Sequence, residues 1–180
     1  MNKNTLSRLF SSTAIGLSFG LLLSGCGQEA ISTDKSVAVT QIKELHDANQ
    51  QDIDNIAANL DVQYRVLTNV PTDKCDANVA NGACFEVELT LTAKAAILAK
   101  NWAIYFSQIS PIQSSQGEEL RVNHLNGDLH QLSLLENFSG FKAGETKSVI
   151  FRANFWMLSE TDALPNYLVT GADLQAKVIA

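Results

Sequence analysis

Two cysteines near the middle of the chain, Cys75 and Cys84, bracket a polar loop. Two thiols at the ends of one loop are expected to pair when a chain is exported to an oxidising compartment. The alternative is a pair of thiolate metal ligands, but no third or fourth ligand accompanies them at the spacing of a zinc site. We predict a Cys75–Cys84 disulfide. On the entropic account, closing this ten-residue loop would stabilise the domain by about 2.5–3 kcal/mol.

A third cysteine, Cys26, follows an N-terminal segment that has the layout of a secretory signal. Lys3 and Arg8 precede an apolar run over 13–23, which is too short to cross a bilayer. Small residues before Cys26 resemble a bacterial lipobox, in which the cysteine is acylated and becomes the new N-terminus. We therefore expect a lipoprotein signal peptide over 1–25 and a polar tether over 26–38; the alternative is an ordinary signal peptide with an incidental cysteine.

The expected location follows from the same segment. An acylated Cys26 would anchor the exported chain to a membrane, and more than one acyl chain is needed for stable anchoring. Gly27, rather than aspartate, follows the cysteine, which favours the outer membrane of a Gram-negative cell. We expect a lipid-anchored protein on the periplasmic face or the surface of that membrane.

Other polar residues do not assemble into a recognisable catalytic or metal site. His124, Asp128 and His130 surround a predicted turn, but they lack a fourth ligand, and Asp128 is suited to capping the turn. Glu86 and Glu88 share one face of a predicted strand and are ordinary surface acids. We predict no cofactor and no metal site.

Hydrophobic alternation predicts an all-β domain. Apolar residues recur at every second position in 62–66, 85–91, 102–106 and 149–155, as in half-buried strands. Two further runs, 120–125 and 129–135, meet across Asn126, Gly127 and Asp128, a tight hairpin in which Gly127 supplies a positive φ. The segment 93–100 fits an irregular loop or a short helix. Turn signals about every ten residues, with brief final strands over 167–170 and 174–179, predict a β-sandwich.

One helix is expected before these strands. Val39, Ile42, Leu45, Ile53 and Ile56 recur at helical spacing, and polar residues interrupt the stripe at its middle. We predict a helix over about 39–59, in one or two pieces, and strands from residue 60. The domain would then occupy 39–180.

Composition limits the partners of this domain. The chain of 180 residues carries a formal net charge of −6 and a pI near 5.0, which argues against a nucleic-acid ligand. Loss of residues 1–25 would remove Lys3 and Arg8 and no acid, leaving 11 basic against 19 acidic residues. Such a surface suits a neutral glycan or another protein.

Several segments, in order along the chain, resemble the N-terminal domain of bacterial chitobiases, the β-N-acetylhexosaminidases of glycoside hydrolase family 20. They read NLDVQYRVLTN from Asn59, NWAIYF from Asn101, NGDLH from Asn126, GFKAGE from Gly140, SETD from Ser159 and KVIA from Lys177. The resemblance covers about residues 55–180. It implies a β-sandwich similar to cellulose-binding domains, proposed in the family to hold polysaccharide such as chitin or chito-oligosaccharide.

The resemblance also implies that no catalytic residue lies in this chain. The family hydrolyses glycosides with a glutamic acid and the substrate's acetamido group. Those groups belong to a barrel of roughly 250 residues, which would follow this domain. We expect either the N-terminal part of a longer enzyme, with a catalytic barrel as partner in cis, or a stand-alone relative.

Four aromatic residues are candidates for a sugar site, because a ring can stack on the C–H face of a pyranose: Trp102, Tyr105, Trp156 and Tyr167. Trp102 shares parity with Ile104 and Phe106 and is expected in the core. Tyr105, on the opposite parity, and Trp156, out of phase with Val149 and Phe151, are the better surface candidates. The alternative is a structural module whose exposed aromatics pack on the catalytic barrel and bind no sugar.

Overall fold

The computed structural model describes residues 44–69, 72–157 and 166–179. They belong to a compact unit, Gln41–Ala180, whereas a second unit, Met1–Thr40, lies outside them. The expected signal peptide, Cys26 and tether, and the segment 158–165, therefore fall outside the described residues. Among the helices that are described, none has the length and apolar content needed to span a membrane.

The described residues form mostly β-structure, with one α-helix, α1 (Gln50–Asn59), and one 3₁₀ turn, η1 (Ala80–Gly82). The strands are β1 (His46–Asp47), β2 (Leu60–Thr68), β3 (Cys84–Ala93), β4 (Ala99–Lys100), β5 (Trp102–Ser107), β6 (Ile112–Gly117), β7 (Leu120–Asn126), β8 (Leu129–Leu134), β9 (Thr146–Asn154), β10 (Leu168–Gly171) and β11 (Lys177–Val178).

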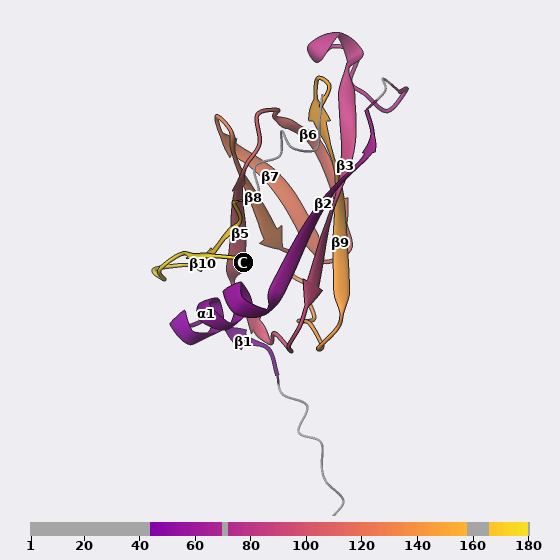
Figure 1. Cartoon of the computed structure of the whole chain (residues 1–180). Coiled ribbons are helices and arrows are strands. Elements are labelled where there is room, and N and C mark those ends of the chain that lie inside the picture. Colours follow the sequence, from indigo (N-terminus) through magenta and orange to yellow (C-terminus); the bar gives the residue numbers. More distant parts are fainter. Residues whose placement is uncertain (1–43, 70–71, 158–165, 180) are drawn as a thin grey trace, which may run out of the picture. The chain divides into compact units, whose positions relative to one another are not determined.

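Two antiparallel sheets face each other as a β-sandwich (Figure 1). One has the strand order β2-β3-β9-β6 and the other the order β11-β10-β5-β8-β7. A short parallel pair, β1 with β4, lies near α1. The predicted all-β sandwich is confirmed.

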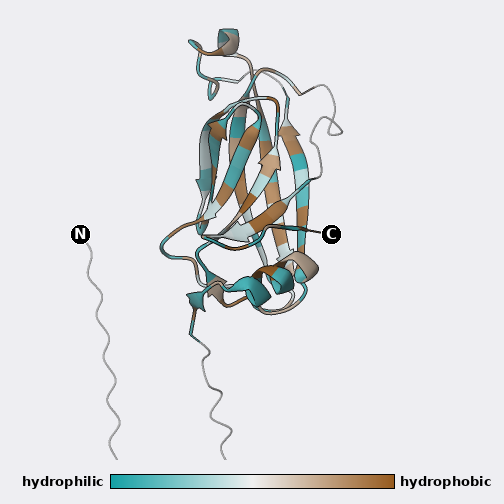
Figure 2. Ribbon diagram, turned by 90° about the vertical axis from the view of Figure 1, so that its left-hand side faces the viewer, coloured by the Kyte–Doolittle hydropathy of each residue, from teal (hydrophilic) through white to brown (hydrophobic). Residues whose placement is uncertain are grey.

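Alternation along the strands builds a single hydrophobic core. The buried positions of β3 include Phe85, Val87, Leu89 and Leu91, and the residues between these four face outward, as predicted. Viewed from the side of β5 and β10, the strands carry alternating teal and brown bands (Figure 2). Both sheets contribute to one cluster, which includes Ile104 from β5, Leu132 from β8 and Phe151 from β9.

The predicted hairpin is confirmed, with β7 and β8 joined around Gly127 at φ +56°. The segment after β3 is a loop that ends in the two-residue strand β4, so the helical alternative for 93–100 is wrong.

The predicted helix over about 39–59 is wrong at 44–49, because α1 begins only at Gln50; residues 39–43 lie outside the described part of the chain. The side-chain oxygen of Asn49 accepts hydrogen bonds from the backbone N–H groups of Gln51 and Asp52, and the Asp52 carboxylate accepts one from the Asn49 N–H. This is a capping box, and it fixes the first turn of the helix. The polar residues that interrupt the apolar stripe are thus a start signal. Ile53 and Ile56 bury the inner face of α1.

The expected inward position of Phe155 is also wrong. Strand β9 ends at Asn154, and Phe155 has a φ of +67°, which turns its side chain out of the alternation and leaves it 52% exposed. Its N–H donates to the carbonyl of Ala83, and the Asn154 N–H donates to the carbonyl of Pro111. These two bonds hold a backbone conformation that is unfavourable for a bulky residue.

Candidate functional site

The register of the five-stranded sheet aligns side chains on its outer face. One row crosses all five strands and consists of Val178, Leu168, Tyr105, Gln131 and Asn123. Leu168 and Val178 are exposed. The row is apolar on the β11–β10 side and carries amides on the β8–β7 side, with the tyrosine between them.

The next row toward α1 contains a small residue at its centre. Thr170, Ala103, Ser133 and Arg121 are aligned across β10, β5, β8 and β7. Because Ala103 has only a methyl group, little side chain stands above the first residues of β5. Ser133 and Thr170, which pair with Ala103, carry small hydroxyl side chains.

A cleft of about 600 Å³ lies over this part of the sheet. Its lining includes 100–101 just before β5, 102–103 and Tyr105 along β5, 133–136 at the end of β8, and 170–172 at the end of β10. The volume is within the range of small-molecule sites in proteins, roughly 300–1,000 Å³. Polar groups and apolar carbons both line it, which is the composition required by a ligand with hydroxyl groups and C–H faces.

Tyr105 stands at one end of the cleft and is held in position by a neighbour. Gln131 Nε2 donates a hydrogen bond of 2.8 Å to the Tyr105 hydroxyl oxygen. An amide has two N–H donors and a carbonyl acceptor, so a single bond leaves Gln131 with capacity for a ligand. The half-buried Tyr105 is where the outward parity of β5 predicts it.

Packing is close at the opposite end of the cleft. A Cβ atom on Gly171 would lie 3.1 Å from the Asn101 carbonyl oxygen, so glycine lets β10 approach this turn. Asn101 has a φ of +61°, and its Nδ2 donates a hydrogen bond of 2.6 Å to Asp47 Oδ1. The corner formed by Lys100 and Asn101 is therefore tied to the N-terminal strand β1.

Two of the four aromatic candidates are buried, although Trp102 borders the cleft from below. Trp102 is 3% exposed, packs edge-on against Phe138 and donates from Nε1 to the Ala99 carbonyl at 2.8 Å, so its ring face is not free to stack on a sugar. Tyr167 is 8% exposed beside Phe106, and burial raises its pKa to about 12. Both belong to the core, because their positions face inward.

Trp156 is exposed, as expected, but the structure does not bring it together with Tyr105. It follows β9 of the other sheet and is 55% exposed, next to the exposed Phe155. The following residue, Met157, is fixed by a hydrogen bond of 2.8 Å from its N–H to Asn69 Oδ1. The loop after β5 carries another exposed apolar side chain, Ile109. A backbone hydrogen bond from the Asn154 N–H to the Pro111 carbonyl connects this loop to β9.

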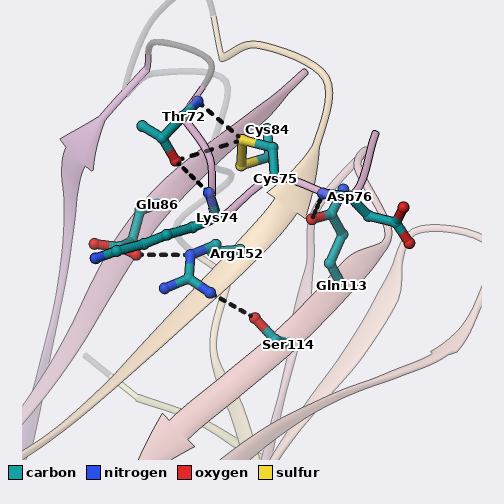
Figure 3. Close-up of a disulfide and its surroundings, with 9 residues drawn as sticks. All are labelled: Thr72, Lys74, Cys75, Asp76, Cys84, Glu86, Gln113, Ser114 and Arg152. Atoms are coloured by element: carbon teal, nitrogen blue, oxygen red, sulfur yellow. Dashed lines mark hydrogen bonds and ion pairs between the residues drawn. A yellow bond between two sulfur atoms is a disulfide. The ribbon is translucent and has the colours of Figure 1, made fainter. Parts of the chain in front are cut away.

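The predicted disulfide is confirmed between Cys75 and Cys84, with the two Cα atoms 5.5 Å apart (Figure 3). Cys84 is the first residue of β3, so the bond fastens the polar loop to the four-stranded sheet. Nearby, Arg152 pairs with Glu86 at 2.9 Å (Figure 3). The alternative of free metal-binding thiols is excluded in this structure.

The histidines at the β7–β8 hairpin form a ring pair, with centroids 4.9 Å apart. His130 is buried and stacks on Phe106, and burial holds its pKa below the usual range. The Asp128 carboxylate accepts a hydrogen bond from Ser107, which lowers its pKa. Over the described parts of the chain, no three or more His, Cys, Asp or Glu side chains are grouped to hold a metal ion.

The sequence pointed to Trp102 and Tyr105 but not to Ala103, Gln131, Ser133 and Thr170, which line the same cleft. A signal for them exists in the outward parity of β5, β8 and β10. That signal cannot be used without the pairing of β5 with β8 and β10, because the register decides which outward residues become neighbours.

Comparisons with known proteins give the family of the chain. The profile of the CHB_HEX family, described as "Putative carbohydrate binding domain", matches residues 59–180. A beta-hexosaminidase of Vibrio vulnificus is 39% identical over 136 residues, and an N,N'-diacetylchitobiase of Vibrio harveyi is 36% identical over 141 residues. These matches cover 74% and 76% of this chain and 16% of each relative, so the chain spans a small part of their length.

A solved structure is also similar. The GH20 exo β-N-acetylglucosaminidase of Vibrio harveyi, in complex with N-acetylglucosamine, matches with a TM-score of 0.47 and 13% identity. The match covers 67% of this chain and 17% of that one. The family profile matches more than half of the chain, and the resemblance noted in the sequence agrees with it. The chain therefore belongs to the CHB_HEX family of carbohydrate-binding domains, found in chitobiases and β-hexosaminidases.

Proposed function

We propose that this domain binds polysaccharide, with chitin or chito-oligosaccharide as the ligand, in the cleft over β5. The observation that carries the proposal is the position of Tyr105, whose partly exposed ring is oriented by Gln131 at one end of the cleft. A ring fixed in this way can stack on the C–H face of a pyranose without losing much conformational entropy on binding.

Charge and expected affinity agree with this ligand. A net charge of −6 disfavours anionic polymers and leaves a neutral glycan acceptable. Binding in the millimolar range needs only about 4 kcal/mol. One stacked ring and a few hydrogen bonds from amide and hydroxyl groups can supply this free energy.

Retention of the purified chain on insoluble chitin tests the proposal. Tyr105→Ala should reduce retention most, Tyr105→Phe should reduce it less because it keeps the ring but loses the hydrogen bond from Gln131, and Trp156→Ala should behave as the unmodified chain. Thermal melts show whether each variant is folded. If Trp156→Ala loses retention and Tyr105→Ala does not, the sugar site lies after β9. If the unmodified chain is retained on neither chitin nor cellulose, the proposal is wrong.

A second candidate function has its own observation. Ile109, Phe155 and Trp156 are exposed by 79%, 52% and 55%, which is unusual for large apolar side chains. We propose, as the alternative, that these residues pack on a family-20 catalytic barrel in cis. Translation of the DNA that follows the last codon shows whether a barrel is encoded there. Binding of the chain to a separately expressed barrel, abolished by Trp156→Ala, would support this alternative over a stand-alone lipoprotein with another partner.

We also propose that the chain is exported and anchored by lipid at Cys26. The small residues before Cys26 and the Cys75–Cys84 disulfide, which suits an oxidising compartment, support this proposal. Cells fed radiolabelled palmitate should label the chain and should not label a Cys26→Ala variant. Equal labelling of the two would contradict acylation at Cys26.

A further inference from the structure

We infer that the cleft holds a linear sugar chain lengthwise along β5, over Ala103, and that Ala103 selects ligands by leaving room for this path. The inference rests on the proposed function and adds to it the orientation of the ligand and the length that the cleft can hold.

The first step is the shape of the cleft. Its lining runs from Lys100 at the end of β4 through Asn101 and along β5 to Tyr105, while its two walls are the ends of the strands that pair with β5. On one side lie 133–136, the last residues of β8 and those that follow, and on the other lie 170–172 at the end of β10. Walls on both neighbouring strands and a floor on the central strand make a trough whose axis is parallel to β5.

The second step is the floor of the trough. Ala103 pairs with Ser133 on one side and with Thr170 on the other. All three side chains are small, and that of Ala103 is the smallest. A leucine at this position would project its branched side chain into the path between Tyr105 and Lys100, whereas alanine keeps the path open.

The third step is the length. Five residue steps separate Lys100 from Tyr105, which corresponds to at most roughly 17 Å of extended strand. This is the length of a short oligosaccharide. Tyr105, held by Gln131, closes one end, and Asn101, held by Asp47, closes the other. Affinity should therefore rise with chain length and reach a plateau when the trough is filled.

A crosswise arrangement is the main competitor. The row that contains Tyr105, Gln131 and Asn123 crosses the strands, and a sugar chain lying on it would contact Asn123 on β7. Asn123 donates to Ser133 Oγ at 3.2 Å and does not line the cleft. The two arrangements thus make opposite predictions for Ala103 and Asn123.

Calorimetric titration of the full chain with chito-oligosaccharides of increasing length separates the two arrangements. The variants are Ala103→Leu, Asn123→Ala and, as a matched control, Ala58→Leu on the exposed face of α1. We expect Ala103→Leu to weaken binding of the trisaccharide by at least about tenfold. Asn123→Ala and Ala58→Leu should change the dissociation constant by less than about twofold. If Ala103→Leu does not fold, Ala103→Val introduces a smaller obstruction in a residue that suits a strand.

The titrations distinguish a failure of the lengthwise path from a failure of the proposed function. Loss of binding in Asn123→Ala with normal binding in Ala103→Leu would establish the crosswise path and overturn the lengthwise one. An affinity that does not depend on the length of the oligosaccharide would also overturn the lengthwise path, while leaving the proposed sugar binding in place. If the unmodified chain binds no oligosaccharide of any length, the proposed function itself fails, and the lengthwise path fails with it.

Discussion

Both outer faces of the sandwich come from strands with alternating buried and outward residues, but the outward residues differ in kind between the two sheets. On the four-stranded sheet, outward charges pair across strands: Arg152 with Glu86 at 2.9 Å and Arg65 with Glu88 at 2.6 Å. On the five-stranded sheet, the central outward residues are an alanine, a tyrosine, amides and hydroxyls, and a cleft lies over β5.

This difference shows which face is suited to a ligand. Charged side chains that pair across strands stabilise a sheet, but few of their donors and acceptors remain free to bind a ligand. Neutral groups around a hollow retain donors and acceptors. We therefore expect changes on the four-stranded side to alter stability alone, and changes on the five-stranded side to alter binding.

The largest effect should come from the disulfide that fastens the loop before β3. Replacing Cys75 and Cys84 together by serine should lower the free energy of unfolding by about 2.5–3 kcal/mol, because the unfolded chain gains loop freedom. Urea denaturation measures this change. Oligosaccharide affinity should stay unchanged, and a parallel loss of affinity in the folded variant would contradict the separation of the two faces.

Next in size is the removal of Arg152 from its pair. Arg152→Leu leaves the Glu86 carboxylate, whose side chain is 17% exposed, without its partner. Because this carboxylate keeps some access to solvent, leaving it unpaired costs less than leaving a fully buried charge unpaired. We expect the free energy of unfolding to fall by about 2 kcal/mol. Adding Glu86→Leu should recover much of this loss in the same denaturation assay. A double variant as unstable as the single one would contradict this explanation.

On the opposite face, Gln131→Ala should mainly affect binding. Tyr105 would lose the hydrogen bond that orients it, and the ligand would lose an amide, together worth about 1 kcal/mol or roughly fivefold in affinity. Stability should change little, because Gln131 faces outward. Titration with chito-oligosaccharide measures the effect. A large fall in melting temperature with unchanged affinity would assign Gln131 a structural role.

Acid should weaken the fold through His130, which lies on the inner side of the five-stranded sheet. Burial lowers its pKa below the ordinary 6.5, so the unfolded chain takes up the proton first. The free energy of unfolding should be highest above pH 6.5, and it should decrease as the pH falls from 6.5 toward the lower pKa of His130 in the folded chain. His130→Phe should remove this step. His124→Gln, which alters the exposed member of the pair, should retain it in urea denaturation at several pH values.

The smallest effect is expected for Arg65, which pairs with Glu88 while its own side chain remains 67% exposed. Arg65→Ala should cost less than about 0.5 kcal/mol, because water screens an exposed ion pair. Denaturation with and without added salt measures it. A loss as large as that of Arg152→Leu would show that exposure does not distinguish the two pairs.

Local patterns were sufficient for most of the fold. The alternation along β3, β5 and β9 determined which residues enter the core, since a strand with one buried face has a period of two. Asn126 and Gly127 determined the hairpin, and the two cysteines at the ends of one polar loop predicted the disulfide. The capping box at Asn49 was also present in the sequence, although we read its polar residues as an interruption of a longer helix.

The proposed binding face could be recognised only in the tertiary structure. Ala103, Gln131 and Thr170 belong to three different strands, and nothing in their local sequences states that β5 lies between β8 and β10. The exposure of Phe155 depends likewise on backbone bonds to distant carbonyls, which impose a positive φ at the end of β9. The hydrophobic period of a strand and the residues of a turn determine structure only within a few positions of the chain. A cleft, in contrast, depends on the register between strands that are far apart in the sequence.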